Sequence, residues 1–513
     1  MQVVMPLDLG IRIPEDDSVR QLIKVTERMD FTVLHQAYVR ASERDEATPK
    51  QLFQLVILGR MNGRYGVREL ERACRTDIRF MWLLQGKRVP SASRFARFIG
   101  QRLSGGVMDE LFYQFVLLLR EDGEIAFENL FVDGTKIEGY ANRYTFVWKK
   151  AVEKNARRLE EKLGNLVTEI KTAYPFETAD SETEEDVLLA LERLASDTGV
   201  VFAHGKGKHK TPLQRSIEAL RGMLSKRAEY ARHREICGSR NSYSKTDHDA
   251  TFMRMKDDPM QNGQLKPAYN LQLGVEGEYI VAADISQDRN DAHTLLPLLD
   301  HMESSGCPTP KNAVTDSGYE SEENYAGLER RGITAYIKPQ NYERRKKRGF
   351  RQNAFLRENM PYDSETDSYT CPAGKRLARQ YDTVRRSGSG YEQRLTVYAC
   401  DACAGCPMKS KCTKAKENRK LTVSKAFDAY RAASLARITG ETGILLRVNR
   451  SIQSEGAFGN LKENWQFRRY MRRGIRNVMT ETLLYAFAYD LKKLHAKTLS
   501  GKLRTHLLFP SSA

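Results

Sequence analysis

The stretch NLFVDGTKIEGYANRYTFVWKK, residues 129–150, decides how the rest of the chain is interpreted. It opens with an apolar run at 130–132, which is typical of a buried strand. The strand is expected to end at Asp133 and Gly134, because glycine lets the chain turn away and leaves the carboxylate at the strand tip. Such a carboxylate either holds a metal ion or simply begins a turn, and the rest of the chain must decide between the two.

The charge balance of the chain points to a polyanionic partner. The 513 residues include 83 Lys and Arg against 66 Asp and Glu, a formal net charge of +17. A field of this sign attracts nucleic acid, although a basic surface can also lack a function. No apolar run reaches the ~18 residues of a membrane span, and the N-terminus lacks the regions of a signal peptide. We therefore expect a soluble, intracellular protein of roughly two to four structural units.

Residues 1–125 are expected to form an all-α, DNA-binding N-terminal domain. Thr48 followed by a proline is typical of a helix N-terminus, and a mostly apolar helix follows it. Further helices are expected at 67–75, from Ser91 onward and at 108–120. Arginines on these short helices can contact DNA grooves or phosphates, although a structural helical cap with solvated arginines is the alternative.

Residues 126–148 and 263–340 carry the pattern of an α/β catalytic core. Beyond the first strand, the expected elements are a hairpin at 268–273 and 279–285, strands at 311–315 and 334–338, and helices at 292–302 and 321–331. This is the element order of a ribonuclease H-like fold, a mixed five-stranded sheet with helices on both faces. In that fold the first and fourth strands lie side by side.

The fourth expected strand repeats the ending of the first. It is followed by Asp316, Ser317 and Gly318, so an aspartate and a glycine again mark the strand tip. Because the two strands are neighbours, we expect Asp133 and Asp316 to lie close enough to share cations. This pairing favours the metal interpretation over a simple turn.

Residues 149–262 are expected to form an inserted helical arm that resembles a coiled coil. Two segments carry apolar residues at intervals of four, three and four: Leu159, Leu163, Leu166 and Ile170, then Leu213, Ile217, Leu220 and Leu224. Each set forms one stripe on a helix, so the two helices are expected to pack together as an antiparallel pair. A basic loop between them, residues 204–210, either contacts DNA or is unstructured.

Residues 341–440 are expected to form a second insertion that is basic and rich in cysteine. It begins with a basic run that contains Arg344, Arg345, Lys346 and Lys347. Since the run follows the last strand, its loop is expected at the sheet edge that carries both aspartates. We interpret the run as a phosphate contact, although most charge runs are simply solvated.

Five of the eight cysteines lie within residues 371–412. In a reducing compartment this clustering favours a metal over disulfides. A tetrahedral zinc site needs four thiols. The favoured zinc ligands are Cys371, Cys403, Cys406 and Cys412, with Cys400 as a substitute or bystander. The spacing C-x2-C-x2-C followed by proline also resembles an iron–sulfur run, and unmetallated thiols are a third interpretation. In each case the group is expected to stabilise a small insertion and to take no part in the chemistry.

Residues 441–495 are expected to complete the core, followed by a tail at 496–513. A helix over 451–462 would place Glu455 and Lys462 on one face, because they are seven residues apart. The expected anchors of this helix are Ile452, Phe458 and Leu461. The glutamate can then complete a three-carboxylate site, and the lysine can hold a phosphate beside it.

Basic and aromatic residues alternate after this helix. The basic members are Arg468, Arg469, Arg472 and Arg473, and the aromatic ones are Trp465, Phe467 and Tyr470. We interpret them as a patch that grips a DNA strand, with core aromatics and a solvated basic face as the alternative. A final apolar helix at 478–494 is expected to pack on the sheet.

In order, these stretches resemble a DDE transposase of a bacterial insertion sequence, from the branch with a helical N-terminal domain and a cysteine-rich insertion. Besides the cysteine segment, the matching stretches are FVDGTKIEGYANRYTFVWKK at 131–150, TDHDATFMRMKDDPMQNGQLKPAYNLQ at 246–272, DSGY at 316–319 and SIQSEGAFGNLKENWQFRRYMRRG at 451–474. Each motif alone is weak, but the ordered set is specific.

The resemblance implies roles for particular residues. Asp133, Asp316 and Glu455 match the metal-binding triad of the family, which implies two Mg²⁺ or Mn²⁺ ions. Lys462 matches a lysine seven residues after the glutamate. The family also has an arginine four residues before the glutamate and a tyrosine seven before it. This chain has Ser451 and Val448 there, and Arg450, one residue away, is the substitute for the arginine.

The resemblance also implies the activity. Such an enzyme binds the ends of its element, cleaves DNA by two-metal hydrolysis and joins the freed 3′-hydroxyl to target DNA by transesterification, with no covalent protein intermediate. The expected partners are element ends, target DNA and at least one more copy of the chain, with no membrane or small-molecule substrate. The expected location is the bacterial cytoplasm, at the nucleoid. Two alternatives are a ribonuclease H-like nuclease without strand transfer and an idle DNA-binding protein derived from a transposase.

Overall fold

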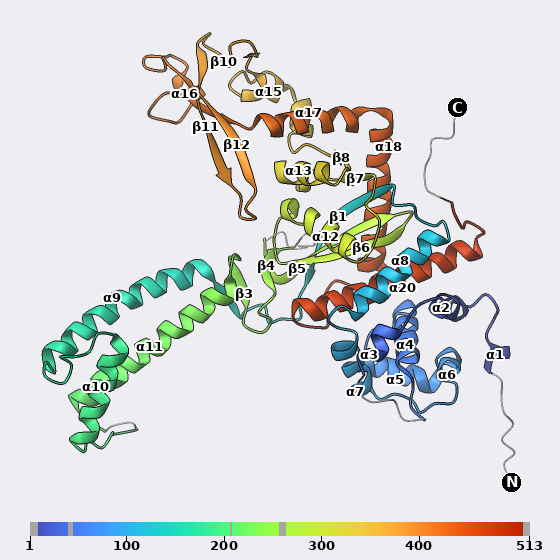
Figure 1. Ribbon diagram of the computed structural model, residues 1–513, viewed down its shortest axis with the longest axis horizontal. Coiled ribbons are helices and arrows are strands. Elements are labelled where there is room, and N and C mark those ends of the chain that lie inside the picture. Colours follow the sequence, from blue (N-terminus) through green and yellow to red (C-terminus); the bar gives the residue numbers. More distant parts are fainter. Residues whose placement is uncertain (1–8, 39–44, 206–207, 256–262, 506–513) are drawn as a thin grey trace. The chain divides into compact units, whose positions relative to one another are not determined.

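The central sheet of the computed structural model joins strands that are far apart in the sequence (Figure 1). The structure describes residues 9–38, 45–205, 208–255 and 263–505. The predicted basic loop at 204–210, the matching stretch at 246–272 and the predicted end domains therefore lie partly outside the described residues, at 206–207, 256–262, 1–8, 39–44 and 506–513. Two compact units are present: residues 1–137, 270–468 and 476–513 form the first, and residues 138–269 and 469–475 form the second.

Within the described residues the sheet has six strands in the order β4-β5-β1-β7-β8, with β6 paired to β5. Their bounds are Asn129–Glu138 for β1, Thr251–Arg254 for β4, Leu265–Glu276 for β5, Tyr279–Ser286 for β6, Asn312–Thr315 for β7 and Thr334–Ile337 for β8. β1, β7 and β8 are parallel, whereas β5 and β6 form an antiparallel hairpin. This mixed sheet is compatible with a ribonuclease H-like core.

Two expectations about the sheet are corrected. β1 does not end at Asp133 but continues to Glu138. Gly134 is not in the left-handed region, and a Cβ there would lie 2.5 Å from Nε2 of Gln272. The glycine therefore permits a close approach of side chains and makes no turn. The described sheet also has six strands where five were expected, because β4 adds to the first residues of β5.

Helices of the first unit pack on this sheet. α12 (Leu295–Ser304) packs on β6, α17 (Lys425–Thr439) on β8, and α18 (Glu441–Arg450) on β7. α13 (Glu322–Arg330) packs on both β8 and α17. Two short 3-10 helices, η2 (Asp291–His293) and η3 (Ser317–Tyr319), contact each other beside the sheet. Elements from distant parts of the sequence thus converge on β7.

The N-terminal part is helical, as expected. Its helices are α1 (Leu9–Arg12), α2 (Ser18–Glu27), α3 (Thr32–Gln36), α4 (Pro49–Met61), α5 (Val67–Thr76), α6 (Ile78–Leu84), α7 (Ala92–Arg97) and α8 (Val107–Glu121), and a π-helical turn at Phe98–Arg102 extends α7. The Thr48 hydroxyl accepts a hydrogen bond from the Gln51 amide as part of a capping box. This confirms the helix start predicted there.

The last helix, α20 (Ile475–Leu499), packs on these N-terminal helices. The ring of Phe487 lies 5.2 Å from Phe53 of α4 and 4.6 Å from Phe115 of α8. Asp490 accepts a hydrogen bond from the Ile280 amide of β6, so α20 also touches the sheet. The predicted contact with the sheet is therefore present, but it is only one part of the packing of α20.

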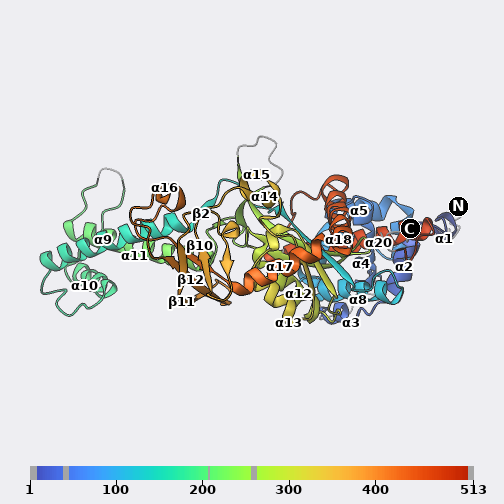
Figure 2. The same cartoon turned by 90° about the horizontal axis from the view of Figure 1, so that it is seen from above.

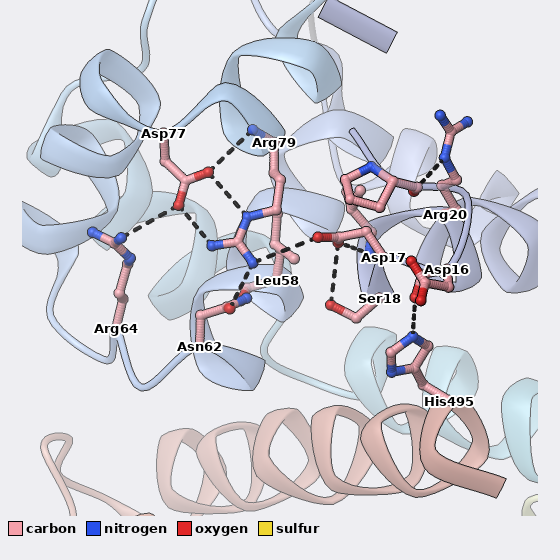
Figure 3. Close-up of polar contacts among 12 residues, drawn as sticks. Asp16, Asp17, Ser18, Arg20, Leu58, Asn62, Arg64, Asp77, Arg79 and His495 are labelled. Carbon is pink, nitrogen blue, oxygen red and sulfur yellow. Dashed lines mark hydrogen bonds and ion pairs between the residues drawn. The ribbon is translucent and has the colours of Figure 1, made fainter. Parts of the chain in front are cut away.

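Polar contacts hold the N-terminal helices together (Figure 3). The guanidinium of Arg79 donates to Asp77 at 2.8 Å and to Asn62 at 3.0 Å, and Arg64 pairs with the same aspartate at 3.3 Å. These arginines stabilise the fold through paired, half-buried contacts, and this use competes with DNA binding at the same side chains.

The second unit contains the predicted helical arm. Figure 1 shows α9 (Lys149–Ala173) and α11 (Pro212–Cys237) side by side, and Figure 2 shows α10 (Glu184–Asp197) with them. The arm core contains most of both predicted stripes, together with Val187 and Leu191 of α10. Leu159 is the predicted stripe residue that lies outside it. α10 was not predicted. At the base of the arm, β2 (Phe146–Trp148) pairs with β3 (Ser242–Ser244).

The cysteine-rich insertion is built on a second, antiparallel sheet with the order β13-β12-β11-β10-β9. Its strands are β9 (Tyr362–Asp363), β10 (Ser368–Thr370), β11 (Arg376–Arg386), β12 (Glu392–Cys400) and β13 (Lys420–Val423). Short helices α14 (Tyr342–Lys346), α15 (Arg348–Arg351), η4 (Arg357–Asn359) and α16 (Lys409–Cys412) flank it. Across the part of the chain that is described, no helix has the length and apolar character to cross a membrane.

Candidate active site

The two aspartates follow paired residues of neighbouring strands. In the parallel pairing of β1 with β7, Val132 lies opposite Thr315. Asp133 and Asp316 are the next residue on each strand path, so the prediction that these strands are neighbours is confirmed. Asp316 caps η3, since its carboxylate accepts a hydrogen bond from the Gly318 amide at 2.8 Å. The two carboxylates therefore start from adjacent positions at one sheet edge.

Arg450 links the first aspartate to the predicted glutamate. Its guanidinium donates to Asp133 at 3.2 Å and lies 3.7 Å from the Glu455 carboxylate. The side chains of Arg450 and Asp133 are each 15% exposed, whereas that of Glu455 is 65% exposed. The structure thus brings Glu455 to the same arginine as Asp133, with its carboxylate open to solvent.

The helix that carries Glu455 is not a regular α-helix. After α18 it continues as a π-helical turn at Ser451–Glu455, one α-helical turn at Gly456–Gly459 and a second π-helical turn at Asn460–Asn464. In a π-helical turn the hydrogen bonds reach five residues along the chain. A residue five positions before Glu455 therefore becomes its neighbour, and that residue is Arg450.

The anchoring of this helix differs from the expectation. Lys462 is half-buried within the second π-helical turn, and its position on the same face as Glu455 stays a prediction. Of the three expected anchors, Phe458 and Leu461 are buried, but Ile452 is 47% exposed and does not anchor the helix.

A cavity beside Asp316 carries several positive charges. Its lining includes Lys338, Arg447 and Arg450, together with the backbone around Ser317. Arginine and lysine next to carboxylates suit a phosphodiester, since the cations bind phosphate oxygens. The cavity can therefore accept a DNA backbone beside Asp316.

The aromatic ring of Tyr342 connects the basic run with this cavity. Arg447, which lines the cavity, lies 5.4 Å from the ring centroid of Tyr342, and Tyr342 begins α14. The expected loop is a short helix containing Arg344, Arg345 and Lys346, with Lys347 as its C-cap. Glu343 pairs with Lys338 at 2.9 Å and with Lys346 at 3.2 Å, which neutralises part of the run.

The pKa of Tyr319 reflects the negative charges of the site. This tyrosine is fully buried, and its pKa is raised well above the usual value by burial and then by Asp291, Asp133 and Asp316. Its hydroxyl donates to the Gln272 side chain of β5. Asp291 was not predicted, although the polar residues Asn270 and Gln272 on an otherwise apolar strand were a signal that a polar site faces β5.

The donor chemistry of the site fits hard cations, although the side chains are not gathered around one. Among the described residues, no three His, Cys, Asp or Glu side chains form a group that could hold a metal ion. Carboxylate oxygens are nevertheless the ligands that Mg²⁺ and Mn²⁺ prefer. The buried amide oxygen of Asn270 accepts no hydrogen bond in the described structure, which leaves one more oxygen donor there. Arg450 places a positive charge beside Asp133.

All five clustered cysteines line one pocket of the second insertion. The thiols are free, and by the same criterion the described residues form no metal group there. Burial raises the pKa of the Cys400 thiol. The sulfur atoms of Cys371 and Cys403 accept backbone N–H groups at 3.4 Å, and that of Cys412 lies 2.9 Å from the Arg419 guanidinium. Zinc is not supported by this geometry and stays a prediction.

The basic and aromatic segment at 465–473 is corrected. Trp465 is only 5% exposed and packs near Tyr485 and Tyr489, so its ring is not presented for stacking on a base. Phe467 and Tyr470 are buried as well. The alternative of core aromatics with basic residues around them is therefore favoured.

The arginines of this segment contact their own chain. Arg468 pairs with Glu463 at 2.5 Å, and the guanidinium groups of Arg469 and Arg473 lie 5.4 and 5.0 Å from the ring centroid of Tyr140. Arg472 is half-buried. DNA contact by Arg468, Arg469, Arg472 and Arg473 stays a prediction.

Comparisons with known proteins agree with the motifs. A family model described as a transposase DDE domain matches residues 370–495, which include Arg450 and Glu455. A second model, described as a transposase domain (DUF772), matches residues 7–101. Searches of curated proteins and of solved structures gave no match. Two transposase family models at separate parts of the chain thus support its recognition as a DDE transposase of an insertion sequence.

Proposed function

We propose that the protein is a DNA transposase that binds the ends of its element, cleaves them by metal-dependent hydrolysis and joins the 3′-hydroxyl ends to target DNA. The observation that carries the proposal is the parallel pairing of β1 with β7, which puts Asp133 and Asp316 at adjacent strand positions. The proximity of Arg450 to both Asp133 and Glu455 supports the assignment of Glu455 as the third carboxylate.

In this proposal Asp133, Asp316 and Glu455 hold two Mg²⁺ or Mn²⁺ ions. Bound there, the ions would supply activation of the attacking oxygen and stabilisation of the leaving one. The carboxylates supply the negative charge that such ions need, and the carboxylate of Glu455 is open to solvent. No protein nucleophile is required.

The positive side chains hold and orient the DNA. Lys338 and Arg447 line the cavity beside Asp316 and would bind phosphate oxygens on either side of the scissile bond. Arg450 pairs with Asp133 and also lines the cavity, so its guanidinium would bind a phosphate oxygen of the DNA there. Lys462 and the basic run at Arg344, Arg345, Lys346 and Lys347 would extend this grip along the backbone.

A strand-transfer assay tests the proposal. Labelled duplexes taken from the DNA that flanks the coding sequence are incubated with a supercoiled target plasmid, Mg²⁺ and either wild type, Asp316→Asn or Asp288→Asn. Asp288 is on the loop after β6, where its carboxylate accepts a hydrogen bond from the Asn290 amide at 3.1 Å. We expect joined products from wild type and Asp288→Asn, and neither cleaved nor joined products from Asp316→Asn.

Two other outcomes would replace the proposal. Cleavage without joined products would identify a ribonuclease H-like nuclease. DNA binding with neither product would identify a DNA-binding protein that has lost its chemistry. The three carboxylates of the proposed site argue against the second outcome, because like charges near one another without a cation repel each other.

A further inference from the structure

We propose that Asp291 is a positioning residue of the carboxylate site: it fixes the two aspartate-bearing segments against each other and adds a fourth negative charge for the cations. This inference rests on the proposed function, since it concerns the same site. Asp291 begins η2, between β6 and α12, and belongs to none of the motifs that the sequence singled out.

Two glycines lie beside this carboxylate, and one of them makes room for it. A Cβ on Gly134, directly after Asp133, would lie 2.9 Å from one oxygen of Asp291, which is closer than real Cβ contacts come. A Cβ on Gly318, two residues after Asp316, would lie 3.4 Å from its other oxygen, an ordinary contact distance. Gly134 does not have a positive φ, so its small size is what the approach of Asp291 uses. Asp291 therefore lies between the two segments that carry the aspartates, with one carboxylate oxygen toward each.

Hydrogen bonds hold Asp291 in this position. One of its oxygens accepts from the Asn270 side chain at 2.7 Å and from the Gln272 side chain at 3.2 Å. Both amides come from the same face of β5 and are 1% and 0% exposed. Gln272 in turn accepts from the hydroxyl of Tyr319, which follows Asp316 and Gly318 in DSGY. A continuous chain of contacts thus joins β5, Asp291 and η3.

A second link fixes the backbone on either side. The buried Asn324 side chain of α13 donates to the carbonyl oxygens of Ala292 at 2.9 Å and of Tyr319 at 2.7 Å. Ala292 follows Asp291, and Tyr319 ends η3. The position of Asp291 relative to Asp316 is therefore set by three elements, β5, η2 and α13, and does not depend on the side chain alone.

The oxygen atoms of Asp291 and Asn270 favour the binding of a cation nearby. One oxygen of Asp291 accepts from the side-chain amides of Asn270 and Gln272, which hold the carboxylate in one place. The other atom of the Asn270 amide, its oxygen, is buried and accepts no hydrogen bond among the described residues. A buried acceptor without a donor is unfavourable, and a cation nearby would offset that cost. Asp291 thus increases the attraction for divalent ions and keeps the aspartates at one spacing.

The test measures metal binding apart from catalysis. Mn²⁺ binding without DNA is followed by the electron paramagnetic resonance signal of the free ion, and the Mg²⁺ concentration for half-maximal cleavage is measured in parallel. The variants are Asp291→Asn, which keeps the side-chain shape, Asp291→Ser as a smaller alternative, and Asp288→Asn as the matched control on the same loop. Thermal unfolding checks that each variant is folded.

We expect Asp291→Asn to weaken Mn²⁺ binding about tenfold and to raise the Mg²⁺ requirement by a similar factor, with cleavage largely restored at high Mg²⁺. Asp288→Asn should match wild type. Unchanged Mn²⁺ binding and Mg²⁺ requirement in a folded Asp291 variant would overturn the inference. If wild type itself neither binds Mn²⁺ nor cleaves DNA, the proposed function fails, and that outcome is distinct from the first.

Discussion

Two regions were predicted as metal sites: the carboxylate edge, with Asp133, Asp316 and Glu455, and the cysteine pocket, lined by the five clustered cysteines. Their side chains are positioned in different ways. At the carboxylate edge, strand pairing places Asp133 and Asp316 at adjacent positions of a parallel sheet. In the pocket, the thiols come from the ends of β10 and β12 and from the loop and short helix that follow. The distance between side chains on hydrogen-bonded strands can be predicted from the strand order. The distances among side chains on loops cannot.

The two regions also differ in charge. Asp133 has an arginine at 3.2 Å, so the carboxylate edge is ionic before any cation binds. The thiols have weaker donors: the sulfurs of Cys371 and Cys403 accept backbone N–H groups, and Cys400 is buried with a raised pKa. The carboxylate edge is therefore suited to chemistry on a charged substrate, and the cysteine pocket to stabilising a small sheet.

The largest expected effect follows from this division. Asp133→Asn and Asp316→Asn should each lower DNA cleavage on the order of a thousandfold or more, because each removes a charge on which the cations depend. Cys403→Ser should leave the rate per folded molecule close to wild type. Rates are measured as single turnovers on a labelled duplex, after the folded fraction is determined. A cysteine variant that folds normally but does not cleave would contradict the division.

Arg450→Ala should separate binding from catalysis at the carboxylate edge. Its removal takes a competing positive charge from Asp133, so Mn²⁺ should bind several-fold more tightly without DNA. Cleavage should nevertheless fall about 10- to 100-fold, because a phosphate contact is lost. Arg450→Lys should lie between, since lysine keeps the charge without the planar fork. Weaker Mn²⁺ binding by Arg450→Ala would show that the arginine supports the carboxylates and does not compete with the cations.

A smaller effect is expected at the cysteine pocket. If the predicted zinc is present, the purified protein should contain about one equivalent, and Cys403→Ser or Cys412→Ser should remove it. The loss should lower the unfolding temperature of the insertion by several degrees, while Cys400→Ser should keep the metal. Metal content by mass spectrometry and unfolding by calorimetry check both. A protein with no bound zinc that melts like its cysteine variants would leave the thiols as packing residues.

Sequence alone was sufficient where strand order and apolar periodicity decide the structure. The pairing of β1 with β7 was predicted from element order, and the packing of α9 with α11 from the spacing of their apolar residues. The helix start at Thr48 was predicted from its capping residues. In each of these cases a local pattern and the tertiary structure require the same arrangement.

Sequence alone was insufficient where the local helix type or a distant contact decides. No spacing rule indicates that Ser451–Glu455 is π-helical, so Arg450 was only a substitute until its contact with Glu455 was visible. Trp465 lies in a basic segment typical of nucleic-acid binding, yet it packs beside Tyr485 of α20. Asp291 was missed because its close approach to Gly134 joins two segments that are far apart in the sequence.

The smallest effect concerns the basic run beside the carboxylate edge. Lys346 pairs with Glu343 at 3.2 Å, whereas Lys347 is exposed at the end of α14. A lysine that must leave a carboxylate to reach phosphate contributes less to binding, so Lys347→Ala should weaken DNA binding two- to fivefold at low salt and Lys346→Ala less. If Lys347 contacts phosphate, its loss should also reduce the slope of log K against log salt by about one. Fluorescence anisotropy across a salt series measures both quantities, and equal slopes for wild type and Lys347→Ala would place the DNA backbone away from α14.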